Sequence, residues 1–248
     1  MVAEILFKSL VLIAAVVRGY EFPEAFKRCR MNDKDFEICL AKTIENAFQL
    51  IGSSGIPSLS LPSIDPIQIT SLEIGAGTSA VNLVQKYKDV KVYGFSKNKV
   101  EEAHMDFDKK ILTFTTLYPE LRQEGKYSVN GKILVIPVFG TGDSVIQLMD
   151  PRIVHTVVFK ELTKNGKKHF HVEDYKLGIS IKGAHYDFQN LFDGDKKLAD
   201  NILKVINENW NVIFEDVRAG VETAYSAVCK AMANRLFDTV PVDDIFLK

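Results

Sequence analysis

The sequence predicts an α+β protein in which a highly curved antiparallel β-sheet wraps one long C-terminal helix. Residues 198–237 contain no proline and repeat apolar side chains every three or four positions, which is the period of an α-helix. Much of the preceding chain instead alternates apolar and polar residues, as half-buried strands do. These alternating runs follow one another without helical segments between them, which favours an antiparallel sheet over a β-α-β arrangement.

The predicted C-terminal helix is long for a globular protein. At a rise of about 1.5 Å per residue it would extend for roughly 60 Å. Asp193, Gly194 and Asp195 precede it and are suited to capping its start, whereas Gly220 is its one weak point. The apolar stripe on this helix is wide and bulky, so it has to be covered along its whole length. The strands upstream are its natural cover.

Residues 1–19 have the features of a secretory signal peptide. Lys8 precedes an apolar run over residues 9–17, and small residues before Tyr20 favour cleavage near Gly19 or Tyr20. The apolar run is too short to cross about 30 Å of hydrocarbon as a membrane anchor. The sequence therefore predicts a secreted, extracellular protein with residues 20–248 as a single domain.

Composition narrows the function further. The chain has 248 residues, of which 46% are hydrophobic and 25% charged, so it can bury a sizeable core. Its net charge of −1 argues against a nucleic-acid partner.

Of its three cysteines, Cys29 and Cys39 are the natural disulfide pair in an oxidising compartment. Cys229 is left as a small apolar residue on the long helix, because no histidine lies near it in sequence to favour a catalytic thiol.

The first half of the chain contains one further predicted helix and a series of strands. Residues 35–51 carry apolar side chains at helical spacing, with Asn32 and Asp33 as caps before them. The glycine-rich run 52–55 ends this helix, and three prolines in residues 56–66 favour an extended loop. Alternating runs then predict strands at 67–74, 90–95, 103–116, 126–129 and 132–139.

Two Asn-Gly pairs predict hairpin turns, because this dipeptide favours the positive φ angles of a two-residue turn. Asn130-Gly131 would join strands 126–129 and 132–139. Asn165-Gly166 would join 154–162 and 168–175. Two further alternating runs complete the predicted sheet, at residues 177–181 and 184–188.

The glycine-rich segment Gly75–Ala80 offers an alternative function. It fits the pattern G-x-G-x-x-A after a strand, as in nucleotide-dependent or S-adenosylmethionine-dependent enzymes. However, the following segment 81–87 is too short for a crossover helix. The next strand ends at Ser96 and Lys97 rather than at an acidic residue that would bind ribose hydroxyls. A strand that turns through a glycine bulge is the preferred interpretation.

No other motif indicates catalysis or metal binding. His169 and His171 share one face of a predicted strand, but metal binding needs further ligands, and the adjacent Lys167 and Lys168 disfavour a cation. A solvent-exposed hairpin is the preferred interpretation of this pair. Paired acidic residues are typical of solvated surfaces here, and no nucleophile elbow is present in the sequence. The sequence therefore predicts a protein that is not an enzyme, without cofactor or metal.

Several segments together resemble the takeout and juvenile-hormone-binding proteins of insects. They occur in that family's order and extend over nearly the whole chain. They are the two N-terminal cysteines, Gly55-Ile56-Pro57, residues 62–66, Tyr93–Ser96, residues 130–137, Gly140-Thr141-Gly142, residues 190–195, 207–210 and 241–246.

The resemblance implies a secreted carrier with a tunnel for an apolar ligand between the long helix and the curved sheet. It implies a small hydrophobic ligand, such as a juvenile hormone-like terpenoid, a fatty acid or a similar lipid, and a link to circadian or feeding regulation. A protein receptor is left open as a partner, and neither the ligand nor the oligomeric state follows from the sequence.

The long helix carries more bulky apolar surface than one antiparallel layer needs to cover, which independently favours a ligand in the interior. The alternative is plain core packing around a collapsed tunnel, in a secreted interaction protein. Tyr225 and Trp210 each have one polar group that could meet a ligand head group. The candidate tunnel residues are Trp210, Ile213, Phe214, Val217, Val221 and Tyr225 on the helix, with Phe114, Val135 and Phe159 on strands.

Overall fold

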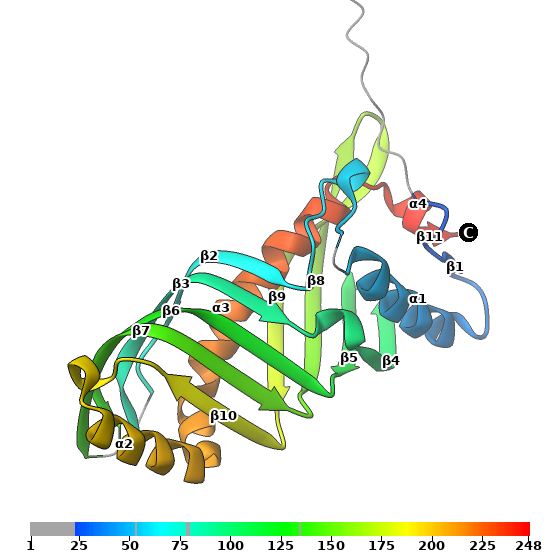
Figure 1. Ribbon diagram of the computed structural model, residues 1–248. Coiled ribbons are helices and arrows are strands. Elements are labelled where there is room, and N and C mark those ends of the chain that lie inside the picture. The colour runs from blue at the N-terminus through cyan, green and yellow to red at the C-terminus, as the bar shows by residue number, and fades with distance from the viewer. Residues whose placement is uncertain (1–22, 53, 78–79, 134) are drawn as a thin grey trace, which may run out of the picture.

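The computed structural model describes residues 23–52, 54–77, 80–133 and 135–248, so the predicted signal peptide lies outside the described residues (Figure 1). The helices are α1 Phe36–Ile51, α2 Lys196–Glu208, α3 Trp210–Phe237 and α4 Val242–Ile245, with short 3₁₀ turns at Pro57–Leu59, Phe95–Lys97 and Phe192–Gly194. The strands are β1 Cys29–Arg30, β2 Ile67–Ile74, β3 Val81–Tyr93, β4 Lys99–Asp106, β5 Ile111–Leu117, β6 Glu120–Ile133, β7 Ile136–Met149, β8 Arg152–Lys164, β9 Lys167–Ser180, β10 Gly183–Phe188 and β11 Phe246–Leu247.

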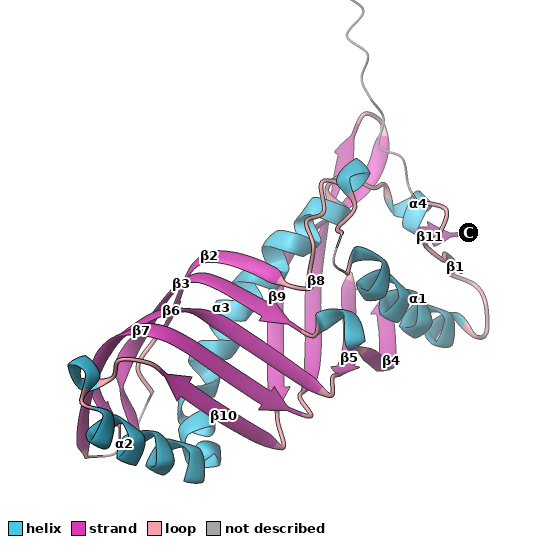
Figure 2. Ribbon diagram, viewed as in Figure 1, coloured by secondary structure: helices cyan, strands magenta, loops and turns pink. Residues whose placement is uncertain are grey.

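The antiparallel strands form two sheets rather than the single sheet expected from the sequence. One sheet has the order β10-β7-β6-β3-β2 and the other the order β4-β5-β8-β9. Both curve around the C-terminal helix, as the strand colouring of Figure 2 shows. Every described pairing within these two sheets is antiparallel, which confirms the predicted fold class.

The predicted 40-residue helix is in fact two helices. The side chain of Asp195 accepts a hydrogen bond from Leu198 N at 3.0 Å and caps α2, as predicted. Helix α2 then ends at Glu208, and the following Asn209 has backbone angles of φ −111° and ψ 27°, which are not helical. Helix α3 begins at the next residue and continues for 28 residues. The prediction of one unbroken helix over 198–237 was therefore wrong, although α3 remains the long rod of the structure (Figure 1).

The break between α2 and α3 coincides with a tertiary contact of Asn207, two residues before Asn209. Asn207 Oδ1 accepts from Tyr186 N at 2.7 Å, and Asn207 Nδ2 donates to Tyr186 O at 2.9 Å. The end of α2 is thus fixed to the edge strand β10. Asn209 Nδ2 in turn donates to Val205 O at 2.8 Å, a second bond to a carbonyl that already accepts from Asn209 N at 3.1 Å. These side-chain bonds stabilise a bend that hydrophobic periodicity does not reveal.

The N-terminal helix α1 begins one residue after its predicted start, ends at the predicted Ile51, and is attached to both ends of the described chain. Gly52 caps its end and donates its backbone N–H to Phe48 O at 3.0 Å. Cys29 and Cys39 form a disulfide, as the sequence indicated, and this bond joins β1 to α1. Strand β1 also pairs in parallel with β11, so the two ends of the described chain lie side by side.

One of the two predicted hairpin turns is confirmed and the other is wrong. Asn165 and Gly166 connect β8 to β9 with φ angles of 51° and 75°. Asn130 and Gly131 instead lie within β6 and pair with Phe139 and Val138 of β7. Strand β6 continues to Ile133 and β7 begins at Ile136, so the two strands are joined beyond Gly131.

Gly131 is required by close packing against strand β3 rather than by a turn. A Cβ at this position would overlap the Asn82 carbonyl oxygen and Leu83 Cβ, and would lie 2.9 Å from Leu83 Cα. Because these are mostly backbone neighbours, β3 would have to move away. The glycine therefore sets the spacing of two adjacent strands.

Replacing Gly131 by alanine is expected to lower the free energy of unfolding by roughly 1–3 kcal/mol, the usual range for forced overpacking. Gly178→Ala on β9 is the matched control, because its nearest contact would be Val154 Cβ at 3.9 Å. That control should leave stability unchanged or raise it by about 0.4–1 kcal/mol through lower chain entropy in the unfolded state. Urea unfolding measures both, and equal stabilities of the two variants would contradict the packing argument.

Candidate functional site

The interior of the protein contains two adjoining apolar cavities along α3. The Tyr225 cavity, of about 90 Å³, lies between α3 and the inner faces of both sheets. The Phe114 cavity, of about 200 Å³, lies between α1, the C-terminal half of α3 and strands β5 and β8. Phe95, His155 and Cys229 belong to the walls of both, so the two spaces meet at these side chains.

Two smaller cavities extend this row at its ends. A space of about 40 Å³ shares Gln85, Tyr186 and Val217 with the Tyr225 cavity. Another, of about 100 Å³, shares Ile44, Phe237 and three further residues with the Phe114 cavity. The four cavities thus follow α3 from its first turn to its last.

The periodicity of α3 explains how one helix lines the whole row. Val217, Val221 and Tyr225 are four residues apart and face the Tyr225 cavity together. Cys229 continues the same face one turn later, where the Phe114 cavity begins. The strands contribute alternate residues, because successive side chains of a strand point to opposite faces. Examples are Leu121 and Gln123 on β6, and Ile153, His155 and Val157 on β8.

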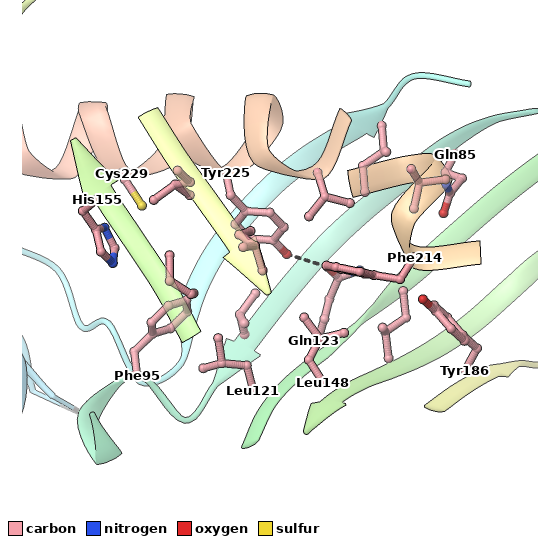
Figure 3. Close-up of a pocket in the computed structure, with 18 residues that line it drawn as sticks. Gln85, Phe95, Leu121, Gln123, Leu148, His155, Tyr186, Phe214, Tyr225 and Cys229 are labelled. Carbon is pink, nitrogen blue, oxygen red and sulfur yellow. Dashed lines mark hydrogen bonds between the residues drawn. The ribbon is translucent and has the colours of Figure 1, made fainter. Parts of the chain in front are cut away.

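The Tyr225 cavity contains a short polar contact within its apolar wall. The Tyr225 hydroxyl donates a hydrogen bond to Gln123 Oε1 across the cavity, from α3 to β6 (Figure 3). Burial raises the pKa of the Tyr225 hydroxyl well above its ordinary value, so it remains a neutral donor. The Tyr186 hydroxyl in the same wall also has its pKa raised by burial.

His155 occupies the junction of the two cavities and is held as a neutral ring. One ring nitrogen lies 2.9 Å from Thr116 Oγ1 and the other 2.9 Å from the Tyr175 hydroxyl. The ring also stacks on Phe114 with centroids 4.2 Å apart. Burial lowers the pKa of His155 to about 3, because a charged imidazolium is unfavourable away from water.

The walls of the two main cavities carry no formal charge at neutral pH. Among the described residues that line them there is no aspartate, glutamate, lysine or arginine. Burial raises the pKa of the Cys229 thiol to about 12, so this side chain also stays uncharged. The site therefore offers apolar contact and a few neutral hydrogen-bonding groups, but no ion pair.

Most of the residues predicted from the helix lie in the cavity walls. Phe214, Val217, Val221 and Tyr225 line the Tyr225 cavity, and Ile213 lines the small cavity beyond it. Trp210 is partly buried and packs against the core next to this row.

The three residues predicted from strands lie in different places relative to the cavities. Phe114 lines the cavity named after it. Phe159 lies outside the four walls, because its ring packs between Phe170 and Phe237, with centroids at 5.0 and 4.7 Å. Val135 does not line a cavity, contrary to the prediction. It is 88% exposed between β6 and β7, because these strands continue past Asn130-Gly131.

Sequence reasoning missed Gln123, His155 and Cys229 as wall residues. A detectable signal exists for His155, since it occupies the middle of the alternating inward positions Ile153, His155 and Val157. A polar residue at such an inward position is buried and needs hydrogen-bond partners. Inward positions are also the ones that contact a ligand in the interior.

The described elements on either side of the glycine-rich segment do not form a β-α-β unit. Residues 81–87 belong to strand β3, and β2 and β3 pair antiparallel, so the helix of a β-α-β unit is absent here. The Asp216 carboxylate of α3 accepts a hydrogen bond from Val81 N at 2.6 Å. A Cβ on Gly77 would overlap this carboxylate, with its Cγ at 2.7 Å. The glycine therefore admits the protein's own acidic side chain, and the nucleotide interpretation was wrong.

The histidine pair also differs from its expected exposed position. His169 is buried, and His171 contacts the Asp238 carboxylate at 2.9 Å, beside the end of α3. Within the described part of the chain, no group of three or more His, Cys, Asp or Glu side chains is placed to hold a metal ion. No helix in that same part is long and apolar enough to cross a membrane.

The structure thus has two curved antiparallel sheets around one long helix, with a row of apolar cavities between them. This arrangement defines a tubular class of protein with an apolar interior. The chain belongs to the haemolymph juvenile hormone binding protein family, whose pattern it matches over residues 9–247.

Named relatives agree with this assignment, and a solved structure shares the fold. The chain is 31% identical to the circadian clock-controlled protein daywake of Drosophila melanogaster over 92% of its length and 89% of that protein. It is 30% identical to daywake of Drosophila yakuba over 91% of this chain and 88% of that protein. The crystal structure of Epiphyas postvittana Takeout 1 superposes with a TM-score of 0.79 at 21% identity, covering 89% of this chain and 99% of that one, which shows the same fold.

Proposed function

We propose that this protein is a secreted carrier that binds a small hydrophobic ligand in the cavities along α3 and performs no chemistry on it. The observation that carries the proposal is the row of apolar cavities that share wall residues from one to the next, of which the two main ones have no charged residue among their described walls. Membership of a family described as juvenile hormone binding proteins supports it.

Apolar burial alone supplies enough free energy for such a carrier. Each buried methylene contributes about 0.8 kcal/mol, so a ligand with a dozen carbons gains roughly 10 kcal/mol before the cost of association. The ligand classes that fit are a juvenile hormone-like terpenoid, a fatty acid or a similar lipid. Secretion through residues 1–19 would deliver the carrier to the extracellular fluid, and the names of the daywake relatives favour a circadian context.

Native mass spectrometry of the protein expressed through its secretory leader tests the proposal directly. A carrier is expected to retain a co-purified apolar molecule that solvent extraction releases. Displacement of a fluorescent apolar probe by fatty acids, terpenoids and quinones would then rank the ligand classes. A protein that neither retains a lipid nor binds the probe would be a secreted interaction protein with a collapsed interior, and the carrier proposal would fail.

A further inference from the structure

The wall of the Tyr225 cavity contains a buried hydrogen-bond donor without a partner. Gln123 is only 8% exposed, and its Nε2 makes no hydrogen bond within the described part of the chain. The other end of the same amide is occupied, because Gln123 Oε1 accepts from the Tyr225 hydroxyl. A buried amide donor without a partner costs about 1–3 kcal/mol, so an acceptor that reaches it is favoured by a similar amount.

The surroundings of Gln123 define which acceptor suits it. No described lining residue of the two main cavities is an aspartate, glutamate, lysine or arginine, and His155 is neutral with both ring nitrogens bonded. A ligand carboxylate placed here would lose its water without gaining a cation. A neutral oxygen, as in an ester, ketone or ether, loses far less on entering and can still accept the Gln123 N–H.

The two joined cavities suit a ligand with an apolar chain and one polar group at its end. The larger Phe114 cavity joins the Tyr225 cavity at Phe95, His155 and Cys229, so an apolar chain placed there directs its other end toward Gln123. The geometry points to Gln123 Nε2 as the selectivity determinant of this site, favouring uncharged ligands with an acceptor oxygen over free carboxylic acids. This inference rests on the proposed carrier function and narrows its ligand class.

Three ligands of similar length test the selection: methyl decanoate, decanoate and undecane, each competing with a fluorescent apolar probe at pH 7.4. Wild-type protein should bind methyl decanoate at least tenfold more tightly than decanoate. The ratio of undecane to ester dissociation constants then reports the contribution of the acceptor oxygen within each variant, independently of changes in overall stability.

The variants are designed around the Tyr225 hydroxyl, which could replace a lost amide as donor. Gln123→Leu combined with Tyr225→Phe removes both of these donors. Tyr225→Phe alone removes the same hydroxyl but keeps Gln123 Nε2, so the double variant should have an undecane-to-ester ratio about fivefold below that of this single variant. Gln68→Leu, an exposed glutamine on β2, should change nothing.

The outcomes separate this inference from the carrier function. Equal binding of ester and acid, or a double variant that retains the ratio of Tyr225→Phe, would overturn the role of Gln123 and leave the carrier standing. Failure of all three ligands to displace the probe would overturn both.

Discussion

Replacing Val221 by tryptophan is expected to weaken the binding of any apolar ligand by at least tenfold. Val221 lies on α3 in the wall of the Tyr225 cavity, four residues before Tyr225. An indole at this position would occupy most of a space of about 90 Å³ and exclude a ligand from it. Because the interior is close-packed, the surrounding strands cannot expand enough to restore that space.

Val212→Trp is the matched control, because Val212 is on the same helix but 47% exposed. It should leave ligand affinity unchanged, as measured by displacement of a fluorescent apolar probe. Thermal unfolding accompanies both measurements, since overpacking at Val221 costs roughly 1–3 kcal/mol of stability. If Val221→Trp folds and still binds with wild-type affinity, the ligand does not occupy this cavity.

Local signals in the sequence predicted the elements that depend on local interactions. Asp195 caps α2 through a bond to a residue three positions on, and Asn165-Gly166 turns within its own hairpin. The face of α3 toward the cavities follows from its own periodicity, which is why Phe214, Val217, Val221 and Tyr225 lie in the wall of the Tyr225 cavity.

The errors have the opposite origin, since each depends on a partner far away in sequence. Gly131 is explained by Leu83 of β3, with which it pairs directly, and not by its own turn propensity. Val135 was misplaced as a consequence of that error. The break between α2 and α3 involves Asn207, whose side chain bonds to Tyr186 on β10. Gln123 was missed because a strand's register against its neighbours decides which residues face inward.

Acidification is expected to destabilise the protein through His155, the second large effect. In the folded protein burial lowers the pKa of His155 to about 3, whereas a histidine in the unfolded chain titrates near about 6.5. Between these values the unfolded state binds a proton that the folded state does not, so stability falls as pH decreases. The stabilisation is fully present above about pH 6.5 and is lost progressively toward pH 3. This difference between the folded and unfolded pKa values corresponds to a change in the free energy of unfolding of about 5 kcal/mol.

His155→Gln isolates this contribution from that of the carboxylates. Asp238, whose pKa is lowered beside His171 and Lys164, also loses stabilisation in acid, so wild type and variant have to be compared as difference curves. The variant loses the stacking on Phe114 and should be less stable at pH 7, but its free energy of unfolding should fall less between pH 7 and pH 4. His185→Gln, at an exposed position on β10, should parallel wild type. Parallel urea-unfolding curves for wild type and His155→Gln over this range would mean that His155 is protonated in the folded protein, and that the junction of the two cavities tolerates a charge.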